Sequence, residues 1–276
     1  PGNWEISRKV YEKFVEEVQT FSTEEIVAKF KLDYSDAQQL FIGLSIYEMF
    51  IQLTNVEKIL VLETNIRDGA IISRLSAPSS ELLTEFNSQI TASAVNLLKK
   101  YHGDVEHAFY VRDVSLLLFD TLRDEIGLDD RARLLLDVAS ILHDIGMFIR
   151  LGDHQLHSQY IISNSEIFGL RKFENNMIAQ IAKYHRGSHF PQDDDQFLML
   201  PRSDRMIILK LTAILRIADA LDRAHQQKLR HLVISKQNDS LLISNKTDHN
   251  IVLERQALIE KANMFEYVFG YKVILS

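Results

Sequence analysis

Cysteine is absent from the 276 residues of this chain. Its absence excludes disulfide bonds, a zinc site with thiolate ligands and a thiol nucleophile. A chain without disulfides is typical of a reducing compartment, so we expect a cytoplasmic protein.

An excess of positive charge is missing as well. The chain has 31 Lys and Arg against 38 Asp and Glu, a net charge of −7, which argues against a general surface for nucleic-acid polymers. No apolar run is long enough to span a bilayer, and the first residues, PGNWEISRKV, do not form a signal peptide. We therefore expect neither a nucleic-acid partner nor a membrane, and any phosphate site must be a local cluster. The sequence starts without Met on a helical pattern, which favours a fragment of a longer protein.

Apolar residues at helical spacing dominate the N-terminal part of the chain. They predict helices over residues 6–18, 22–30 and 36–53. Ser22 followed by Glu25 matches a capping box, which fixes the start of the second helix. The short apolar run KILVL at 58–62 predicts a buried strand.

The segment ETNIRDGAIISRL after this strand reads as a polar loop and then a helix that begins at Gly69. A strand, a polar loop and a helix N-terminus in this order often bind an anion. The alternative is an ordinary strand–helix turn. The sequence APSS at 77–80 interrupts the pattern, so we expect a domain boundary after Pro78.

The following stretch is almost wholly helical in pattern. Its predicted helices are 81–101, 104–126, 129–147, 153–164, 172–185 and 203–225. Gly127 is expected to end one helix and Asp129 to cap the next. The acidic run PQDDDQ at 191–196 is interpreted as a solvated loop, with a metal site as the alternative.

The last part of the chain changes to a mixed pattern. It predicts a hairpin, a helix and a final strand at 232–235, 241–244, 253–267 and 271–275. The expected protein is therefore mainly α, with domains at 1–78, 79–228 and 229–276, the last a small ββαβ unit.

His143 and Asp144 stand side by side in the apolar stretch LLLDVASILHDIGMF. Imidazole and carboxylate together suit a divalent ion such as Mn, Fe, Co, Ni or Zn. Burying this pair without a bonding partner would cost on the order of several kcal/mol, so a partner is required, and a metal ion is the simplest candidate. The alternative is a hydrogen-bonded core histidine beside an aspartate that bonds a neighbour. Further candidate ligands along the chain are His107, His157, His185 and Asp219.

The ordered set His107, His143-Asp144 and Asp219 resembles the HD superfamily of metal-dependent phosphohydrolases. His157 and His185 resemble the two further histidines of members that hold two metals. The resemblance implies a first divalent ion on the ordered set and a second ion on His157 and His185, with Asp144 bridging; the ion is Mn, Fe, Co, Ni, Zn or Mg. His154 and His189 lie near the set in sequence and are kept as weaker candidates.

A broader resemblance covers nearly the whole chain. EKILVLETNIRDGAIISRL resembles the end of the actin-like core of exopolyphosphatases and guanosine pentaphosphate phosphohydrolases, with Glu63, Arg67, Asp68 and Gly69 matching a family motif in kind. HSQYII at 157–162, IAKYHRGSH at 181–189 and ADALDR at 218–223 resemble later motifs of the same family. The resemblance implies the α/β tail end of an actin-like (ribonuclease H-like) domain, then an all-helical HD-like domain, then the ββαβ unit.

The same resemblance shows what this sequence does not contain. The family's polyphosphate hydrolysis is assigned to glycine-rich loops of the DIGGGS type and a general-base glutamate, and neither has a match in the chain. This polypeptide alone is therefore not expected to cleave polyphosphate by the family's usual route. The HDIG motif is intact, whereas some members have glutamate in place of the aspartate, so His143 and Asp144 stay candidates for a second, catalytic site.

Four basic side chains near the histidines are candidates for phosphate binding: Lys183, Arg186, Arg216 and Arg223. Arginine grips phosphate through a bidentate fork; the alternative is a solvated or salt-bridged surface group. Three functions stay open. The chain is the C-terminal part of an exopolyphosphatase-type hydrolase, an independent HD phosphohydrolase for a nucleotide or phosphate ester, or a non-catalytic regulatory module. The expected ligand is polyphosphate or a phosphorylated nucleotide.

A homodimer is expected through the helical domain. The family that the chain resembles is usually dimeric, and the helix containing VSLLLF at 114–119 carries more apolar residues than one core face needs. The competing explanation is that this helix is central to its own domain and buried all round.

Overall fold

The computed structural model describes residues 3–54, 56–62, 80–186, 191, 194–245 and 249–276. The chain divides into two units, Pro1–Pro78 and Ser79–Ser276, and each is described by itself. ETNIRDGAIISRL lies outside the described residues, so the roles expected for Glu63, Arg67, Asp68 and Gly69 stay predictions. None of the described helices combines the length and the apolar composition that a bilayer crossing requires.

The described residues of the first unit form three helices and a two-stranded sheet. Its elements are β1 (Asn3–Ser7), α1 (Arg8–Val18), α2 (Thr23–Phe30), α3 (Tyr34–Leu53) and β2 (Lys58–Leu62). The strands are antiparallel, with Asn3 opposite Leu62. Val18, Ile26 and Ala37 form the buried centre where the three helices meet.

Two expectations for this unit are corrected. The helix expected from Ile6 begins at Arg8, because Ile6 pairs with β2 and the Ser7 hydroxyl caps the helix by accepting from the Val10 backbone N–H. The Ser22–Glu25 capping box is confirmed. The strand at 58–62 is also confirmed, but it is not buried: Leu60 is 65% exposed because the strand belongs to a sheet of only two strands.

The second unit contains the long helical stretch. Its helices are α5 (Ser80–Lys100), α6 (Val105–Thr121), α7 (Arg123–Ile126), α8 (Asp130–Leu142), the 3-10 helix η1 (Ile145–Phe148), α9 (His154–Ser163), α10 (Lys172–Tyr184), α11 (Asp195–Leu198) and α12 (Arg202–Ala220). Gly127 ends α7 with a φ of 57°, and the Asp129 carboxylate caps α8 by accepting from the Ala132 backbone N–H. Both capping predictions are confirmed.

Three of the predicted helices are longer than those observed. The helix expected over 104–126 divides at Leu122, which leaves helical geometry at φ −98° and ψ 11°. The helix expected over 129–147 ends at Leu142 and resumes as η1. The helix expected over 203–225 ends at Ala220, and the following turn is held by the Asp222 carboxylate, which accepts from the backbone N–H groups of Gln226 and Gln227. Part of the expected acidic loop forms the short α11.

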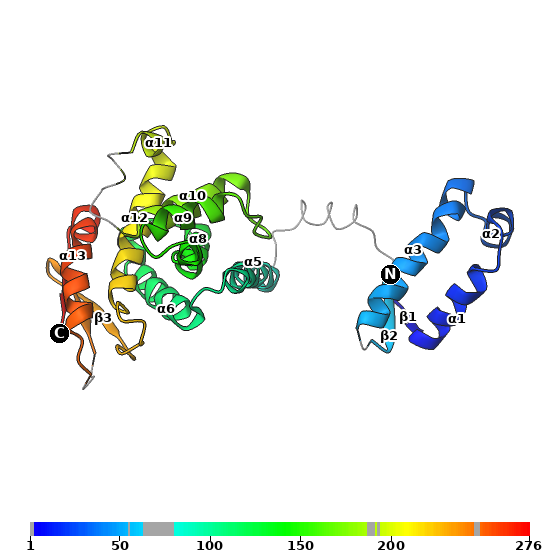
Figure 1. Ribbon diagram of the computed structural model, residues 1–276, viewed down its shortest axis with the longest axis horizontal. Helices are drawn as coiled ribbons and strands as arrows, with labels where there is room; N and C mark the ends of the chain where they lie inside the picture. The colour runs from blue at the N-terminus through cyan, green and yellow to red at the C-terminus, as the bar shows by residue number, and fades with distance from the viewer. Residues whose placement is uncertain (1–2, 55, 63–79, 187–190, 192–193, 246–248) are drawn as a thin grey trace. The chain divides into compact units, whose positions relative to one another are not determined.

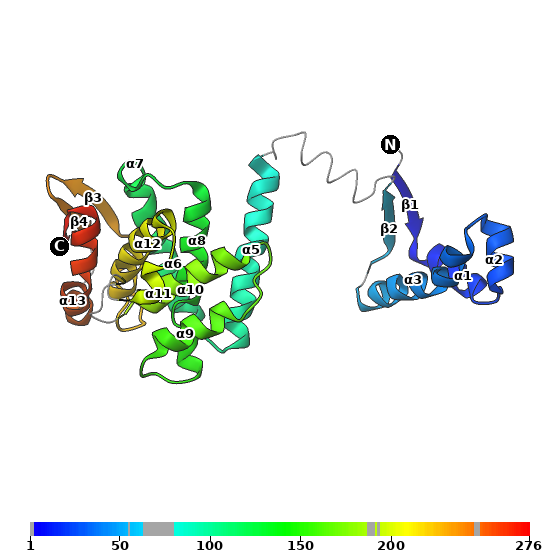
Figure 2. The ribbon, with the colours of Figure 1, turned by 90° about the horizontal axis from the view of Figure 1, so that it is seen from above.

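Helix α12 lies at the centre of this unit. Both views place it between α13 (Val252–Phe269) on one side and α8 and α10 on the other, with α5 at the opposite edge from α13 (Figures 1 and 2). Its residues from Leu211 to Ala220 are all buried. Ligands carried by the end of α12 are therefore surrounded by other helices.

The C-terminal segment forms the expected ββαβ arrangement. Strands β3 (Val233–Gln237) and β4 (Ser240–Ser244) form an antiparallel hairpin, and β5 (Lys272–Leu275) pairs parallel to β4 after α13. One hydrophobic core runs from Ile90 of α5 to Leu275 of β5, so this segment shares its core with the helices. Helix α13 packs directly on α12.

The VSLLLF run lies within this shared core. Val114, Leu118 and Phe119 are at most 5% exposed, whereas Leu117 is 39% exposed. The burial supports the central-helix explanation for this run. The homodimer stays a prediction that rests on the family resemblance alone.

Candidate metal centre

Three separate segments of the second unit bring the HD residues together. His107 lies in the first turn of α6, where the Asp104 carboxylate accepts from its backbone N–H. His143 and Asp144 lie where α8 ends, and Asp144 has φ −100° and ψ 5°. Asp219 comes from the last turn of α12. Because α8 stops at this point, the His-Asp pair lies at the end of the helix and not along its side.

Gly146 allows η1 to lie directly against the start of α9. A Cβ on this residue would clash with the His154 carbonyl oxygen and the Ser158 backbone nitrogen. The Gly146 N–H also donates to the Ser158 hydroxyl at 2.9 Å. The glycine of HDIG therefore lets η1 and the start of α9 come into direct contact, and this contact delivers a further histidine to the centre.

The first group of side chains meets around Asp144 Oδ2. His107 Nε2 and His143 Nε2 lie 3.7 and 3.6 Å from this oxygen and 3.3 Å from each other. Asp219 Oδ1 lies 3.7 Å from His107 Nε2 and 3.9 Å from His143 Nε2. Ligand atoms about 2.0–2.2 Å from a shared metal lie about 3–3.5 Å apart, so these spacings suit a divalent ion after a small contraction.

A second group meets on the other oxygen of the same carboxylate. His154 Nε2 lies 2.9 Å and His185 Nε2 lies 3.2 Å from Asp144 Oδ1, and the two nitrogens are 3.3 Å apart. Asp144 thus faces two histidines with each oxygen. This is the arrangement expected for a bridging ligand.

His154, not His157, occupies the position next to Asp144. His157 is only half-buried, and no side-chain hydrogen bond or ion pair joins it to another described residue. The two histidines are three residues apart on α9, so both lie near one face of the helix. Sequence spacing therefore does not reveal which of the two histidines reaches Asp144. That depends on the Gly146 contact, which positions the first turn of α9. His189 lies outside the described residues.

The other ring nitrogen of each histidine is bound away from the centre. His107 Nδ1 lies 2.8 Å from Asp222 Oδ2, and His143 Nδ1 lies 2.8 Å from the Ser140 carbonyl oxygen. His154 Nδ1 and His185 Nδ1 lie 3.0 and 2.6 Å from the backbone carbonyls of residues 151 and 182. A carbonyl only accepts, so a contact of this kind places the proton on Nδ1 and leaves the Nε2 lone pair facing Asp144.

Electrostatics at the centre favour a cation. Burial lowers the pKa of His143 to about 4, which keeps its ring neutral and able to ligate. Burial alone would lower the pKa of His107, but the Asp222 hydrogen bond and nearby carboxylates raise it above its usual value. Burial opposes ionisation of Asp144, yet the neighbouring imidazoles hold the pKa of its carboxyl well below the usual range.

Asp144 Oδ1 is one of several buried side-chain atoms that have no hydrogen-bond partner among the described residues, and it is the one that faces the histidines of the centre. It is buried and has no directed hydrogen bond among the described residues, although two imidazole nitrogens approach it closely. Buried carboxylate oxygens are normally hydrogen-bonded. A purely hydrogen-bonded core does not account for this oxygen, and the donor set of imidazoles and carboxylates fits a divalent metal.

His225 is a further histidine at the centre that the sequence did not indicate. Its ring stacks on His107 with centroids 3.6 Å apart, and its Nε2 lies 4.0 Å from Asp144 Oδ2. Its Nδ1 lies 3.0 Å from Asp104 Oδ2. It follows α12 in the turn held by Asp222, which was expected to be helical, so the sequence pattern placed it on the wrong element.

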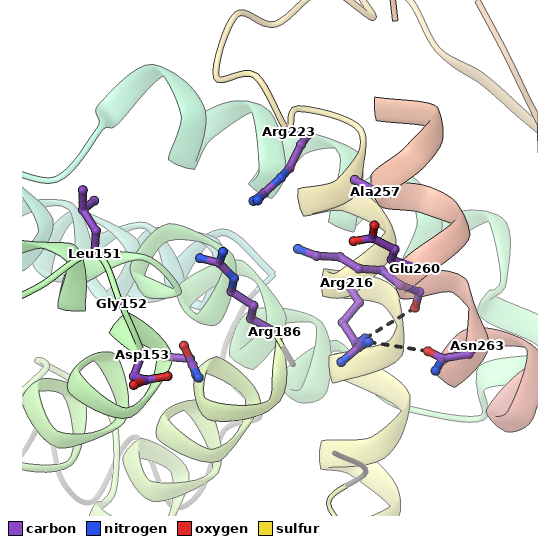
Figure 3. Close-up of a pocket in the computed structure, with 11 residues that line it drawn as sticks. Leu151, Gly152, Asp153, Arg186, Arg216, Arg223, Ala257, Glu260 and Asn263 are labelled. Atoms are coloured by element: carbon purple, nitrogen blue, oxygen red, sulfur yellow. Dashed lines mark hydrogen bonds between the residues drawn. The ribbon is translucent and has the colours of Figure 1, made fainter. Parts of the chain in front are cut away.

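Figure 3 shows a basic cavity, of about 670 Å³, whose lining includes residues that contact the metal centre. Its lining includes Arg186, Arg216 and Arg223, three of the side chains expected to bind phosphate. In Figure 3, Arg186 and Arg223 point into the space, while Arg216 turns toward Asn263 of α13. Arg186 Nη1 also lies 3.2 Å from His154 Nδ1. Lys183, the fourth expected side chain, is ion-paired with Asp194 and is not among the lining residues.

Lys261 of α13 lines the same cavity and was not indicated by the sequence. Its ammonium forms a buried ion pair with Asp219 Oδ2. Together with Arg186 it connects the cavity to the metal centre at two points. Finding it from sequence would require knowing that the C-terminal helix packs on α12.

The family model of Ppx/GppA phosphatase domain III matches residues 91–265. The chain belongs to the Ppx/GppA phosphatase family. The match includes every residue of the candidate metal centre, and it confirms the family resemblance that the sequence motifs indicated. In Ppx/GppA terms, the second unit is therefore a domain III.

Three curated relatives named guanosine-5'-triphosphate,3'-diphosphate pyrophosphatase are similar to this chain. The one from Aliivibrio fischeri (strain MJ11) is 26% identical over 203 residues, which are 73% of this chain and 39% of the relative. The one from Pseudoalteromonas translucida is 29% identical over 146 residues, 52% and 28% of the two chains. The one from Aeromonas hydrophila is 27% identical over 159 residues, 55% and 30%. The chain thus spans about two fifths or less of the length of these relatives.

Proposed function

We propose that the second unit binds one or two divalent metal ions and acts on phosphate groups, as part of a Ppx/GppA-type phosphohydrolase. The observation that supports this most directly is the set of four histidines whose Nε2 atoms face the two oxygens of one aspartate, Asp144. Their outer nitrogens contact protein acceptors, which is the usual outer arrangement of metal-binding histidines.

The first ion would be held by His107, His143, Asp144 and Asp219, and the second by His154, His185 and Asp144. Two such ions supply Lewis acidity toward a phosphoryl oxygen and lower the pKa of a bound water. The protein's own contribution is to hold these ligands, to orient His107 through Asp222, and to bind substrate phosphate through Arg186 and Arg223 beside the centre.

The substrate class is a phosphorylated nucleotide or polyphosphate. The basic cavity supports a ligand with several negative charges, because four cationic side chains line it against the two carboxylates of Asp153 and Glu260. The relatives' name, a pyrophosphatase of a guanosine polyphosphate, is consistent with such a ligand. We further propose that the first unit is the end of an actin-like domain, as its motif resemblance implies.

Metal content and hydrolysis test this function separately. Elemental analysis after expression with added metal is expected to find one or two first-row divalent ions per chain. Less than about a tenth of an equivalent would contradict the proposed metal centre. The chain is then assayed with a guanosine polyphosphate and with long polyphosphate, beside a His143→Gln variant. We expect negligible release from long polyphosphate. Turnover of about one per second or more that disappears in His143→Gln would instead assign polyphosphate hydrolysis to this centre.

An independent HD phosphohydrolase is the alternative. It is favoured by the intact His-Asp pair and the second group of histidines, all of which lie in the second unit. Metal-dependent hydrolysis of a nucleotide by residues 79–276 alone would support it. A bound metal without hydrolysis of any phosphate ester would favour a regulatory module.

A further inference from the structure

The two oxygens of Asp219 have different partners. Oδ1 faces His107 Nε2 and His143 Nε2 at 3.7 and 3.9 Å, on the side of the metal centre. Oδ2 is held by the ammonium of Lys261. The side chains of both charged partners are at most 10% exposed, so the pair is shielded from solvent. One carboxylate therefore serves both the candidate metal centre and a buried cation.

Lys261 also borders the basic cavity, so its ammonium lies between two sites. Its flexible four-carbon stem carries three rotatable donors, which can be directed to either side. Arg216 cannot do the same, because its guanidinium donates to the Lys261 and Tyr184 carbonyl oxygens at 3.4 and 3.3 Å and to Asn263 Oδ1 at 3.5 Å. These bonds also anchor the backbone of Lys261 and leave its side chain as the part that can move.

We propose that Lys261 is an exchangeable counter-ion that couples the two sites. It neutralises Asp219 while the first metal position is empty, and it turns to a tetrahedral oxyanion in the basic cavity when Asp219 ligates a metal. Metal and oxyanion then bind with positive cooperativity. This inference rests on the proposed metal centre and adds an anion-dependent control of its occupancy.

The charges of the residues support this exchange. A divalent ion on Asp219 and the Lys261 ammonium compete for the same carboxylate charge and repel each other, so each weakens the binding of the other. An oxyanion in the cavity offers Lys261 a new partner, which removes this opposition. By linkage, the factor by which the anion tightens metal binding equals the factor by which the metal tightens anion binding. A phosphate group of a substrate would thereby favour the metal-loaded state in which it is held.

Mn²⁺ titrations with sulfate as the oxyanion probe test the coupling. Sulfate is tetrahedral and doubly charged like a phosphate group, and it is not hydrolysed. Metal-free protein is titrated with Mn²⁺ by calorimetry, with and without sulfate, at constant ionic strength. We expect sulfate to tighten Mn²⁺ binding by about tenfold, within the range usual for coupled sites. The reciprocal titration of sulfate should show the same factor.

The variants are Lys261→Met and the control Lys183→Met, whose lysine is ion-paired with Asp194 away from the cavity lining. In Lys261→Met, Mn²⁺ affinity without sulfate should rise above that of the wild type, and the sulfate effect should fall below about twofold. In Lys183→Met the coupling should persist. A merely structural ion pair predicts the opposite, namely weaker Mn²⁺ binding in Lys261→Met at every sulfate concentration.

The outcomes separate this inference from the proposed function. Mn²⁺ binding in the wild type that does not respond to sulfate overturns the coupling and leaves the metal centre intact. No Mn²⁺ binding at all overturns the metal centre and the coupling with it. If Lys261→Met does not fold, the size of the coupling factor in the wild type decides, since a factor near one contradicts the exchange.

Discussion

The two sides of Asp144 differ in how firmly their ligands are held. On one side, His107 is tied to the Asp222 carboxylate, and a second carboxylate, Asp219, completes the group. On the other side, His154 and His185 have backbone carbonyls behind them, and Arg186 approaches His154. The first side therefore offers two negative ligands to an ion and the second offers only its share of Asp144. We infer that metal fills the two sides in that order.

Removing the shared ligand tests both sides at once. Asp144→Asn keeps the shape of the side chain but removes its charge and one of its two acceptor oxygens. We expect loss of most bound metal from both sides, because both sides use Asp144 as a ligand and the second side has no other carboxylate among the described residues near it. Elemental analysis after dialysis measures the effect, with the exposed Asp113→Asn as control. Retention of more than about half of the metal would show that Asp144 is not the bridge.

The next largest effect should be confined to the second side. His154→Gln is expected to remove one metal equivalent or abolish the weaker binding step, whereas His157→Gln on the same helix should change neither. The reason is that His154 Nε2 lies 2.9 Å from Asp144 Oδ1, while no hydrogen bond or ion pair joins the His157 side chain to a described residue of the centre. Calorimetric Mn²⁺ titration resolves the two steps. The reverse pattern would favour the position that the sequence motif HSQYII indicated.

These two histidines show where sequence reasoning reached its limit. The helical pattern, the three capping predictions and the ββαβ tail follow from local residue chemistry, and the structure confirms them. The HD pair and Asp219 were visible because each is a distinctive residue in an apolar stretch. His154, His225 and Lys261 depend on which turn of one helix faces another, and that is decided by long-range packing such as the Gly146 contact and the placement of α13 on α12.

The outer support of the first side gives a smaller and more selective effect. Asp222→Asn replaces a carboxylate that accepts from His107 Nδ1, from the Gln226 and Gln227 backbone and from the Gln227 amide. Loss of such outer support typically weakens metal binding by about 10–100-fold. We expect this loss for the stronger Mn²⁺ step only. An equal loss of Mn²⁺ affinity at both steps would mean that Asp222 does not act on the His107 side of Asp144 alone.

The smallest expected effect concerns the cavity beside the metal centre. It contrasts two basic residues that were both predicted from the sequence to bind phosphate. Arg223 is exposed, lines the cavity and forms no hydrogen bond or ion pair with another described residue, whereas Lys183 is already paired with Asp194. Arg223→Met should therefore weaken sulfate binding by up to about fivefold, the range of solvent-exposed ion pairs, while Lys183→Met should leave it unchanged. The loss should shrink at high ionic strength, because an exposed charge is screened by salt. Sulfate titrations of both variants at low and high salt measure this. Equal losses in the two variants would indicate a general attraction of the basic surface for anions. The cavity would then not be a specific anion site beside the metal ligands.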